Sequence, residues 1–242
     1  MAESGDPDVA FAGFSEFLAG LSAGVQTLSL LMARPDLARD IVRAMTYAPK
    51  LGRDLARRPD LLEAVLYPAS ASTPDGHGAA DDLERQVAAA DGFEGKLNAA
   101  RRLHREQAFR IGYGLLQGSL RAQQAGEAYS ELADACVRVL AEASAADVEA
   151  RFGGRIGRWA VCAMGKFGGR ELTATSDLDL MLIYEPLDAS DGALPARFVQ
   201  RLIAALSAPT PEGLLYEVDM QLRPSGRAGP VAVRFSAFES YY

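Results

Sequence analysis

Two aspartates separated by one residue are the strongest sign of chemistry in this sequence. Asp177 and Asp179 stand in the run Asp-Leu-Asp-Leu, which we expect to form a β-strand. Because side chains alternate between the two faces of a strand, both carboxylates leave the same face. Like charges at this spacing repel each other and raise the pKa of one carboxyl group, so a divalent cation between them resolves the repulsion. Oxygen ligands of this kind suit Mg²⁺, which also pairs with substrate phosphates.

A glycine-rich turn with one lysine precedes the two acids. Gly165, Lys166, Gly168 and Gly169 supply backbone amides without side-chain obstruction, together with a cation, as a phosphate cradle requires. The turn is not a Walker A loop, because no Gly-Lys-Ser/Thr closes it, and by itself it is a weak signal. A metal site and a phosphate cradle together indicate nucleotide chemistry.

A third acid, Asp219, lies in a later apolar segment. Two acids on one strand and a third on a neighbouring strand can hold two metal ions. One ion lowers the pKa of an attacking hydroxyl group and the other stabilises the leaving pyrophosphate. Positioning and electrostatics are sufficient to carry such a transfer. We therefore predict that Asp177, Asp179 and Asp219 are the catalytic and metal-binding residues of a nucleotidyl transfer site.

Other polar residues flank these acids. Ser176 can donate to a phosphate or cap the end of the strand. Three arginines that follow the third acid can bind phosphate oxygens in a bidentate way; they are Arg223, Arg227 and Arg234. The predicted nucleotide-binding residues are Gly165, Lys166, Gly168, Gly169, Ser176 and Arg223.

The elements that must position these residues alternate between strand and helix. The expected strands are 159–164, 178–184, 214–222 and 230–235, and the expected helix is 195–206. Such alternation favours an α/β or α+β unit. This unit follows a part of the chain with helical periodicity only.

The first part of the chain has helical periodicity over about residues 6–66. An apolar stripe at helical spacing, which we expect to pack in a core, comprises Phe11, Phe14, Leu18 and Leu21. The segment Arg-Pro-Asp-Leu occurs at 34–37 and again at 58–61. Each copy places proline and an acid where the first turn of a helix tolerates them, which predicts stacked short helices.

A linker and further helices follow. Residues 68–80 form the clearest linker, and we expect His77 within it to be a solvated loop residue. Helical signals resume over 81–120 and 129–150, and Gly153 and Gly154 end them. A basic cluster on the first of these helices comprises Arg101, Arg102, His104, Arg105 and Arg110. We interpret this cluster as a solvated helix face, with a surface for an acidic partner as the alternative.

Composition restricts the class of protein. Of the 242 residues, 49% are hydrophobic, which is ordinary for a globular protein. The net charge of −7 argues against a general nucleic-acid-binding surface. Cys136 and Cys162 lie in apolar segments and are interpreted as reduced, buried thiols. The absence of a run of 18 apolar residues predicts no membrane span, and the acidic start predicts no signal peptide. We expect a cytoplasmic protein.

Several motifs resemble those of the bacterial glutamine synthetase adenylyltransferases. They are Gly165-Lys166-x-Gly168-Gly169-Arg170-Glu171-Leu172, Ser176-Asp177-Leu178-Asp179-Leu180, Tyr216-Glu217-Val218-Asp219-Met220 and Leu222-Arg223-Pro224-Ser225-Gly226. The resemblance is dense over about 159–242. It departs from the family at Gln221, where arginine is usual, and at Phe167, where leucine is usual.

The resemblance implies an α+β fold. A helical linker or regulatory region at 1–122, with a flexible loop near 68–80, would precede a DNA polymerase β-like nucleotidyltransferase domain with a mixed sheet at 123–242. The family continues beyond this point through further helices, so we expect a truncated domain. Asp177, Asp179 and Asp219 would be its triad of metal-binding carboxylates.

The resemblance also implies an activity and partners. The enzymes of this family transfer AMP from ATP to a tyrosine hydroxyl of glutamine synthetase with Mg²⁺, release pyrophosphate, and so control nitrogen assimilation. A second domain of the same enzymes removes AMP by phosphorolysis. The motifs here are closer to the adenylylating half. The deadenylylating half is one alternative, and a regulatory fragment that binds glutamine synthetase or the PII signalling protein, with little activity alone, is another.

Overall fold

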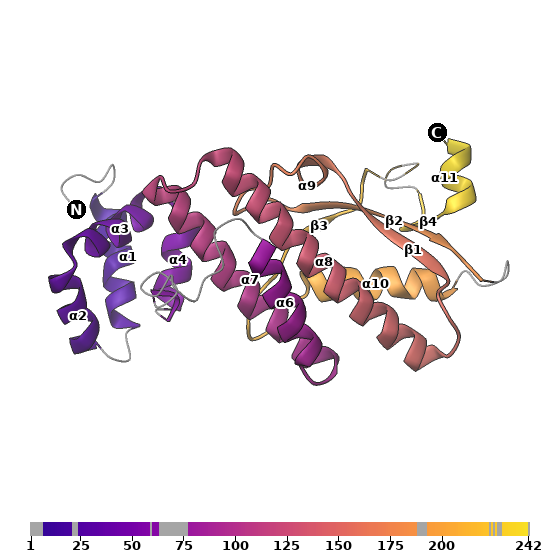
Figure 1. Cartoon of the computed structure of the whole chain (residues 1–242), viewed down its shortest axis with the longest axis horizontal. Helices are drawn as coiled ribbons and strands as arrows, with labels where there is room; N and C mark the ends of the chain where they lie inside the picture. Colours follow the sequence, from indigo (N-terminus) through magenta and orange to yellow (C-terminus); the bar gives the residue numbers. More distant parts are fainter. Residues whose placement is uncertain are drawn as a thin grey trace.

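The computed structural model is an elongated, mostly helical molecule with a small sheet at one end (Figure 1). It describes residues 7–20, 24–58, 60–62, 77–187, 193–222, 224, 226 and 229–241. Leu21, Arg223, Arg227 and linker residues 68–76 therefore lie outside the described residues.

Short helices occupy the end of the molecule opposite the sheet. They are α1 (Pro7–Ala19), α2 (Gly24–Ala33), α3 (Pro35–Tyr47) and α4 (Pro49–Arg57). Proline begins both α3 and α4, because the first turn of a helix needs no hydrogen bond from its nitrogen. Their apolar faces enclose a small core around Phe17, Ile41 and Leu55.

The repeated Arg-Pro-Asp-Leu segment makes the same local contact twice. Arg34 donates to the Asp36 carboxylate and Arg58 to the Asp60 carboxylate. The first copy begins α3, as predicted. The predicted apolar stripe is only partly confirmed, because Phe11 is 63% exposed whereas Phe17, which the prediction omitted, is fully buried.

Three further helices form the middle of the molecule (Figure 1). They are α6 (His77–Ala89), α7 (Gly92–Gln117) and α8 (Ala122–Phe152). The predicted linker 68–80 was wrong at its end, since α6 begins at His77 and includes 77–80. Helix α8 ends where Gly153 takes a positive φ of 70° and donates its amide to Glu149, which confirms the predicted stop.

The sheet is built around one central strand. Its strands are β1 (Arg158–Ala163), β2 (Leu178–Glu185), β3 (Val218–Asp219) and β4 (Ala232–Arg234). β1 runs antiparallel to β2, whereas β3 and β4 run parallel to it. The sheet is therefore mixed, and the α+β class is confirmed.

The predicted strand 214–222 is reduced to two residues. Before β3, the Tyr216 amide donates to the carbonyl of Leu206, at 3.1 Å. Leu206 lies near the end of α10 (Ala193–Ser207). Because this amide bonds to a helix end, it is withdrawn from the sheet ladder, and regular pairing begins only at Val218.

A single large core joins the middle helices to the sheet. It extends from Leu83 through α8 to β2 and α10, and therefore includes residues on both sides of position 122. Phe198 of α10 is fully buried and contacts the Trp159 ring, with centroids 4.8 Å apart. A one-turn helix, α9 (Gly165–Gly168), and the terminal α11 (Phe235–Tyr241) complete the fold. The described helices include none that is long and apolar enough to span a bilayer.

Candidate functional site

The beginning of β2 presents the predicted acids. Leu178 and Leu180 point into the core with 0% and 3% exposure, so the intervening alternation leaves Asp177 exposed and Asp179 half-buried on the opposite face. Parallel pairing places Asp179 directly beside Asp219 of β3. The structure thus brings the three predicted acids to one edge of the sheet.

The glycine turn lies against the same acids. The amide of Met164 donates to the Asp179 carbonyl at 2.9 Å, which ties the start of α9 to β2. Gly165 has a φ of 52°, and a Cβ there would lie 2.2 Å from Asp179 Oδ2. Gly168 is also required, because its Cβ would lie 2.6 Å from the Ala163 carbonyl oxygen. Gly169 has no such constraint, since its nearest neighbour would be 3.5 Å away.

A connector between the turn and the acids is held by α8. Residues 170–172 pass close to α8 at Gly126, where an added Cβ would be in ordinary van der Waals contact with them at 3.5 Å. Ser130 Oγ accepts from the Leu172 amide at 3.4 Å, and Arg170 pairs with Glu131. Nothing local in the sequence marks a contact between positions about forty residues apart, so these α8 residues could not be predicted.

Ser176 has a local role in this structure. Its hydroxyl accepts from the Thr173 amide at 3.0 Å and contacts the Thr173 hydroxyl at 2.9 Å. Thr173 precedes β2, so these contacts hold the loop before the strand, and capping of the strand end by Ser176 stays a prediction. A role of Ser176 toward phosphate stays a prediction, as does the role of Arg223, which lies outside the described residues.

The electrostatics of the acids fit a cation. Burial raises the pKa of Asp179, and the carboxylates of Asp177 and Asp219 raise it further, whereas Lys166 lowers it. Oxygen donors that repel one another form the ligand set that a divalent cation neutralises. Within the described ranges, however, no group of three or more histidine, cysteine, aspartate or glutamate side chains is gathered closely enough to hold a metal.

Gln221 contacts the third acid, Asp219. Its amide donates to Asp219 Oδ1 at 2.7 Å and its side-chain Nε2 donates to Asp219 Oδ2 at 2.9 Å. Both oxygens of Asp219 therefore have local donors. Gln221 thus places a neutral donor on the third acid.

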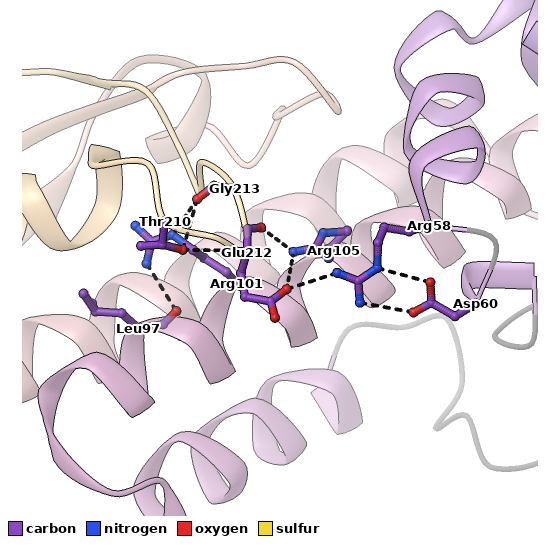
Figure 2. A network of polar contacts seen from close by, with 8 residues as sticks. All are labelled: Arg58, Asp60, Leu97, Arg101, Arg105, Thr210, Glu212 and Gly213. Atoms are coloured by element: carbon purple, nitrogen blue, oxygen red, sulfur yellow. Dashed lines mark hydrogen bonds and ion pairs between the residues drawn. The ribbon is translucent and has the colours of Figure 1, made fainter. Parts of the chain in front are cut away.

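Helix α7 anchors the segment that leads to Asp219 (Figure 2). Arg101 is 1% exposed and donates to three carbonyl oxygens of the segment at the end of α10. These contacts are to Ala205 at 2.8 Å, Ala208 at 2.7 Å and Gly213 at 2.9 Å. Arg105 donates to the backbone carbonyl of Glu212 and, at 3.0 Å, to its carboxylate.

The interpretation of the basic cluster as a solvated helix face was wrong for its main members. Arg101 is buried, and His104 is 8% exposed with its ring 4.7 Å from that of Tyr216. The acidic partner of the cluster is Glu212 of the same chain, which also pairs with Arg58 at 3.2 Å. The residues that meet here are more than a hundred positions apart, so helical periodicity alone could not pair them.

The two cysteines are free, as predicted. Burial raises the pKa of the fully buried Cys136 thiol and also that of Cys162, which is only half-buried. Neither thiol is activated toward chemistry, because a reactive cysteine needs a lowered pKa.

The molecule is thus an α+β protein with a carboxylate-rich sheet edge beside a glycine turn. Residues 38–242 match the family model described as glutamate-ammonia ligase adenylyltransferase. The chain therefore belongs to this family, and the resemblance seen in its motifs is confirmed.

Curated relatives cover almost the whole chain. Proteins from Caulobacter vibrioides, Xanthobacter autotrophicus and Rhizobium meliloti are 47%, 46% and 44% identical over 99%, 100% and 99% of it. Each of these relatives is named bifunctional glutamine synthetase adenylyltransferase/adenylyl-removing enzyme. The alignments cover 24%, 26% and 26% of those proteins, so the chain spans about a quarter of their length.

Proposed function

We propose that this chain carries a nucleotidyltransferase site that transfers AMP from ATP to a tyrosine hydroxyl of glutamine synthetase and releases pyrophosphate. The observation that carries the proposal is the alignment of Asp179 with Asp219 on parallel strands, next to Asp177 and the glycine turn. A polymerase β-like arrangement of the domain at 123–242 is part of the proposal, with the helices of 1–122 as its linker or regulatory region.

The residues of the site have separable roles in this proposal. Asp177, Asp179 and Asp219 would hold Mg²⁺, for which their oxygen donors and mutual repulsion are suited. When bound, the ion supplies charge neutralisation and favours the ionised form of an attacking hydroxyl. The start of α9 and the exposed Lys166 would hold ATP phosphates, whereas the amides of Gly168 and Gly169 already donate to the carbonyls of Met164 and Gly165. Gln221 orients Asp219 until ligands compete for its oxygens.

Labelled transfer tests the proposal directly. The chain, extended to the full length of its relatives, is incubated with glutamine synthetase, Mg²⁺ and ATP labelled in the adenylyl group. We expect label on glutamine synthetase, and a loss of at least about a hundredfold in the Asp177→Asn variant, as is typical when an electrostatic component of a site is removed. Asp134→Asn, at an exposed site on α8, is the matched control and should keep full activity. Transfer that is unaffected by Asp177→Asn would sink the proposal.

The phosphorolytic half is the alternative within the same fold. It predicts phosphate-dependent release of ADP from adenylylated glutamine synthetase and no forward transfer. The adenylylating alternative is favoured by the run Leu-Tyr-Glu-Val-Asp at 215–219 with Leu-Arg-Pro-Ser-Gly at 222–226. Measuring both reactions with one preparation separates the two halves.

A regulatory fragment is the alternative from another class. In that case the helices of 1–122 would bind the PII protein or glutamine synthetase, and catalysis would need segments outside this chain. Binding of the whole chain to either protein, without label transfer by any longer version, would favour this alternative.

A further inference from the structure

A cavity of about 330 Å³ lies between the helical region and the segment that precedes β3. Three parts of the chain line it: α4 together with Arg58 directly after it, α7, and residues 211–215. This cavity has a different lining from the carboxylate edge, and none of the predicted acids or turn glycines contributes to it. Clefts between separate elements are a common place for small-molecule sites.

The cavity is strongly basic. Its cationic lining residues are Lys50, Arg57, Arg58, Arg101 and Arg105, and its acidic ones are Asp54 and Glu212. Among the described residues, no carboxylate forms an ion pair with Lys50 or Arg57. The lining of the cavity therefore carries more positive than negative charge, although the whole chain has a net charge of −7. Converging cations of this kind attract anions.

An internal carboxylate already demonstrates the binding chemistry. Glu212 Oε2 accepts from Arg58 Nη1 at 3.2 Å and from Arg105 Nη2 at 3.0 Å (Figure 2). Two guanidinium groups that converge on one oxygen make an arrangement that binds carboxylate and phosphate oxygens. Lys50 and Arg57 line the same cavity without such a partner in the described part of the chain.

The charge of these groups acts inside the cavity. His104 lines it and is almost fully buried. The pKa of His104 is lowered to about 3, chiefly by burial and in addition by the charges of Lys50 and Arg105. Cations from two helices, Lys50 of α4 and Arg105 of α7, therefore both act on the His104 ring. Their electric fields overlap inside the cavity, where the dielectric constant is low.

We propose that this cavity binds a small phosphate-bearing anion, with Lys50 and Arg57 as its principal ligands and Arg105 as a shared donor. The cavity is large enough to take a phosphate group together with a small organic part, because ligand sites begin at about 300 Å³. The anion would provide the counter-charge that Asp54 and Glu212 only partly supply. The site is distinct from the proposed ATP site and does not depend on its activity.

Calorimetric titration without divalent metal tests the proposal, because EDTA removes metal-dependent binding at the carboxylates. The three titrants are inorganic phosphate, glycerol phosphate and glycerol. We expect saturable binding of at least one phosphate compound with a Kd below about 1 mM, and none of glycerol. Binding of phosphate alone identifies the free ion as the ligand, and tighter binding of glycerol phosphate identifies a phosphate ester.

The variants locate the binding. Lys50→Gln and Arg57→Gln should each weaken it at least tenfold, whereas Lys50→Arg should retain it. Arg102→Gln is the matched control, since Arg102 lies exposed on α7 outside the cavity. Circular dichroism verifies that each variant is folded. Binding that is lost in Lys166→Gln but kept in Lys50→Gln would place the phosphate at the glycine turn and overturn the proposal, as would the absence of saturable binding.

Discussion

The carboxylate of Asp179 lies against the backbone of Gly165. A Cβ on Gly165 would overlap with its carboxylate, and the positive φ of Gly165 is itself unfavourable for other residues. We expect Gly165→Ala to displace Asp179, to destabilise the fold by about 1–2 kcal/mol, and to reduce adenylyl transfer much more than Gly169→Ala. Gly169 is the matched control, because its φ of −78° and open surroundings accept a methyl group. Urea unfolding and transfer assays on the two variants measure the difference, and equal behaviour would contradict the assigned geometry.

His104 makes stability depend on pH. Its pKa is about 3 in the folded protein and 6.5 in the unfolded chain, chiefly because of burial. As the pH falls, the unfolded chain takes up a proton on His104 at a higher pH than the folded protein does. The contribution of the neutral imidazole to the free energy of unfolding is therefore fully present above pH 6.5 and is lost as the pH falls from 6.5 toward 3. Between pH 7.5 and 5.5 this loss amounts to up to about 1.4 kcal/mol.

A histidine-free comparison isolates this effect. His104→Gln is expected to be less stable at neutral pH, because it loses the ring contact with Tyr216, but its stability should fall less between pH 7.5 and 5.5. The measurement is the free energy of unfolding in urea at both pH values. Parallel pH profiles of the two proteins would show that His104 titrates normally.

The sequence was informative about single residues where the signal is local. Asp177 and Asp179 could be assigned to one face because strand alternation depends only on their spacing. The burial of Arg101 could not be predicted, because its carbonyl partners at 205, 208 and 213 are far along the chain. A charged side chain on a helix is ordinarily exposed, and only the tertiary contact reverses this expectation.

At the scale of elements, the end of α10 and the start of β3 depend on α7. Arg101 donates to the carbonyls of Ala205 and Ala208 near the helix end, and such carbonyls have no partner within the helix. Arg101→Met would leave these buried acceptors unpaired, for which we expect a loss of about 2–4 kcal/mol. Arg102→Met, on the exposed face of the same helix, should be nearly neutral. Urea unfolding distinguishes the two, and equal stabilities would show that the anchor contributes little.

The prediction of elements succeeded for the helices and failed for the strand that precedes Asp219. The helices α7, α8 and α10 were predicted from their apolar periodicity, although α8 begins seven residues before the predicted position 129. The predicted strand 214–222 was wrong before Val218, because the Tyr216 amide bonds to the end of α10 and the Tyr216 ring packs on His104 of α7. An apolar pattern indicates burial, but tertiary structure determines which groups form hydrogen bonds with the backbone.

At the scale of the whole molecule, two cores meet at α7. Phe109 belongs to the small core of α1–α4, whereas Leu103 and Ile111 of the same helix belong to the large core that reaches the sheet. The predicted boundary at 122/123 follows motif content and stays a prediction, whereas the division between cores lies earlier in the chain. A smaller core buries less apolar surface per residue and is expected to open at lower cost.

This division predicts the order of unfolding. Hydrogen exchange measured by mass spectrometry at increasing urea should show α1–α4 losing protection before α8 and β2. Phe109→Ala should lower the urea midpoint of α1–α4 selectively, since large-to-small changes at buried positions cost about 3–5 kcal/mol. Leu132→Ala, in the large core at 1% exposure, should lower the midpoint of α8 and leave the earlier opening of α1–α4 nearly unchanged. If both variants shift all segments together, the two cores unfold as one cooperative unit. The ion pairs of Glu212 with Arg58 and Arg105 are then the contacts to remove next, because they join the end of α4 to the segment before β3.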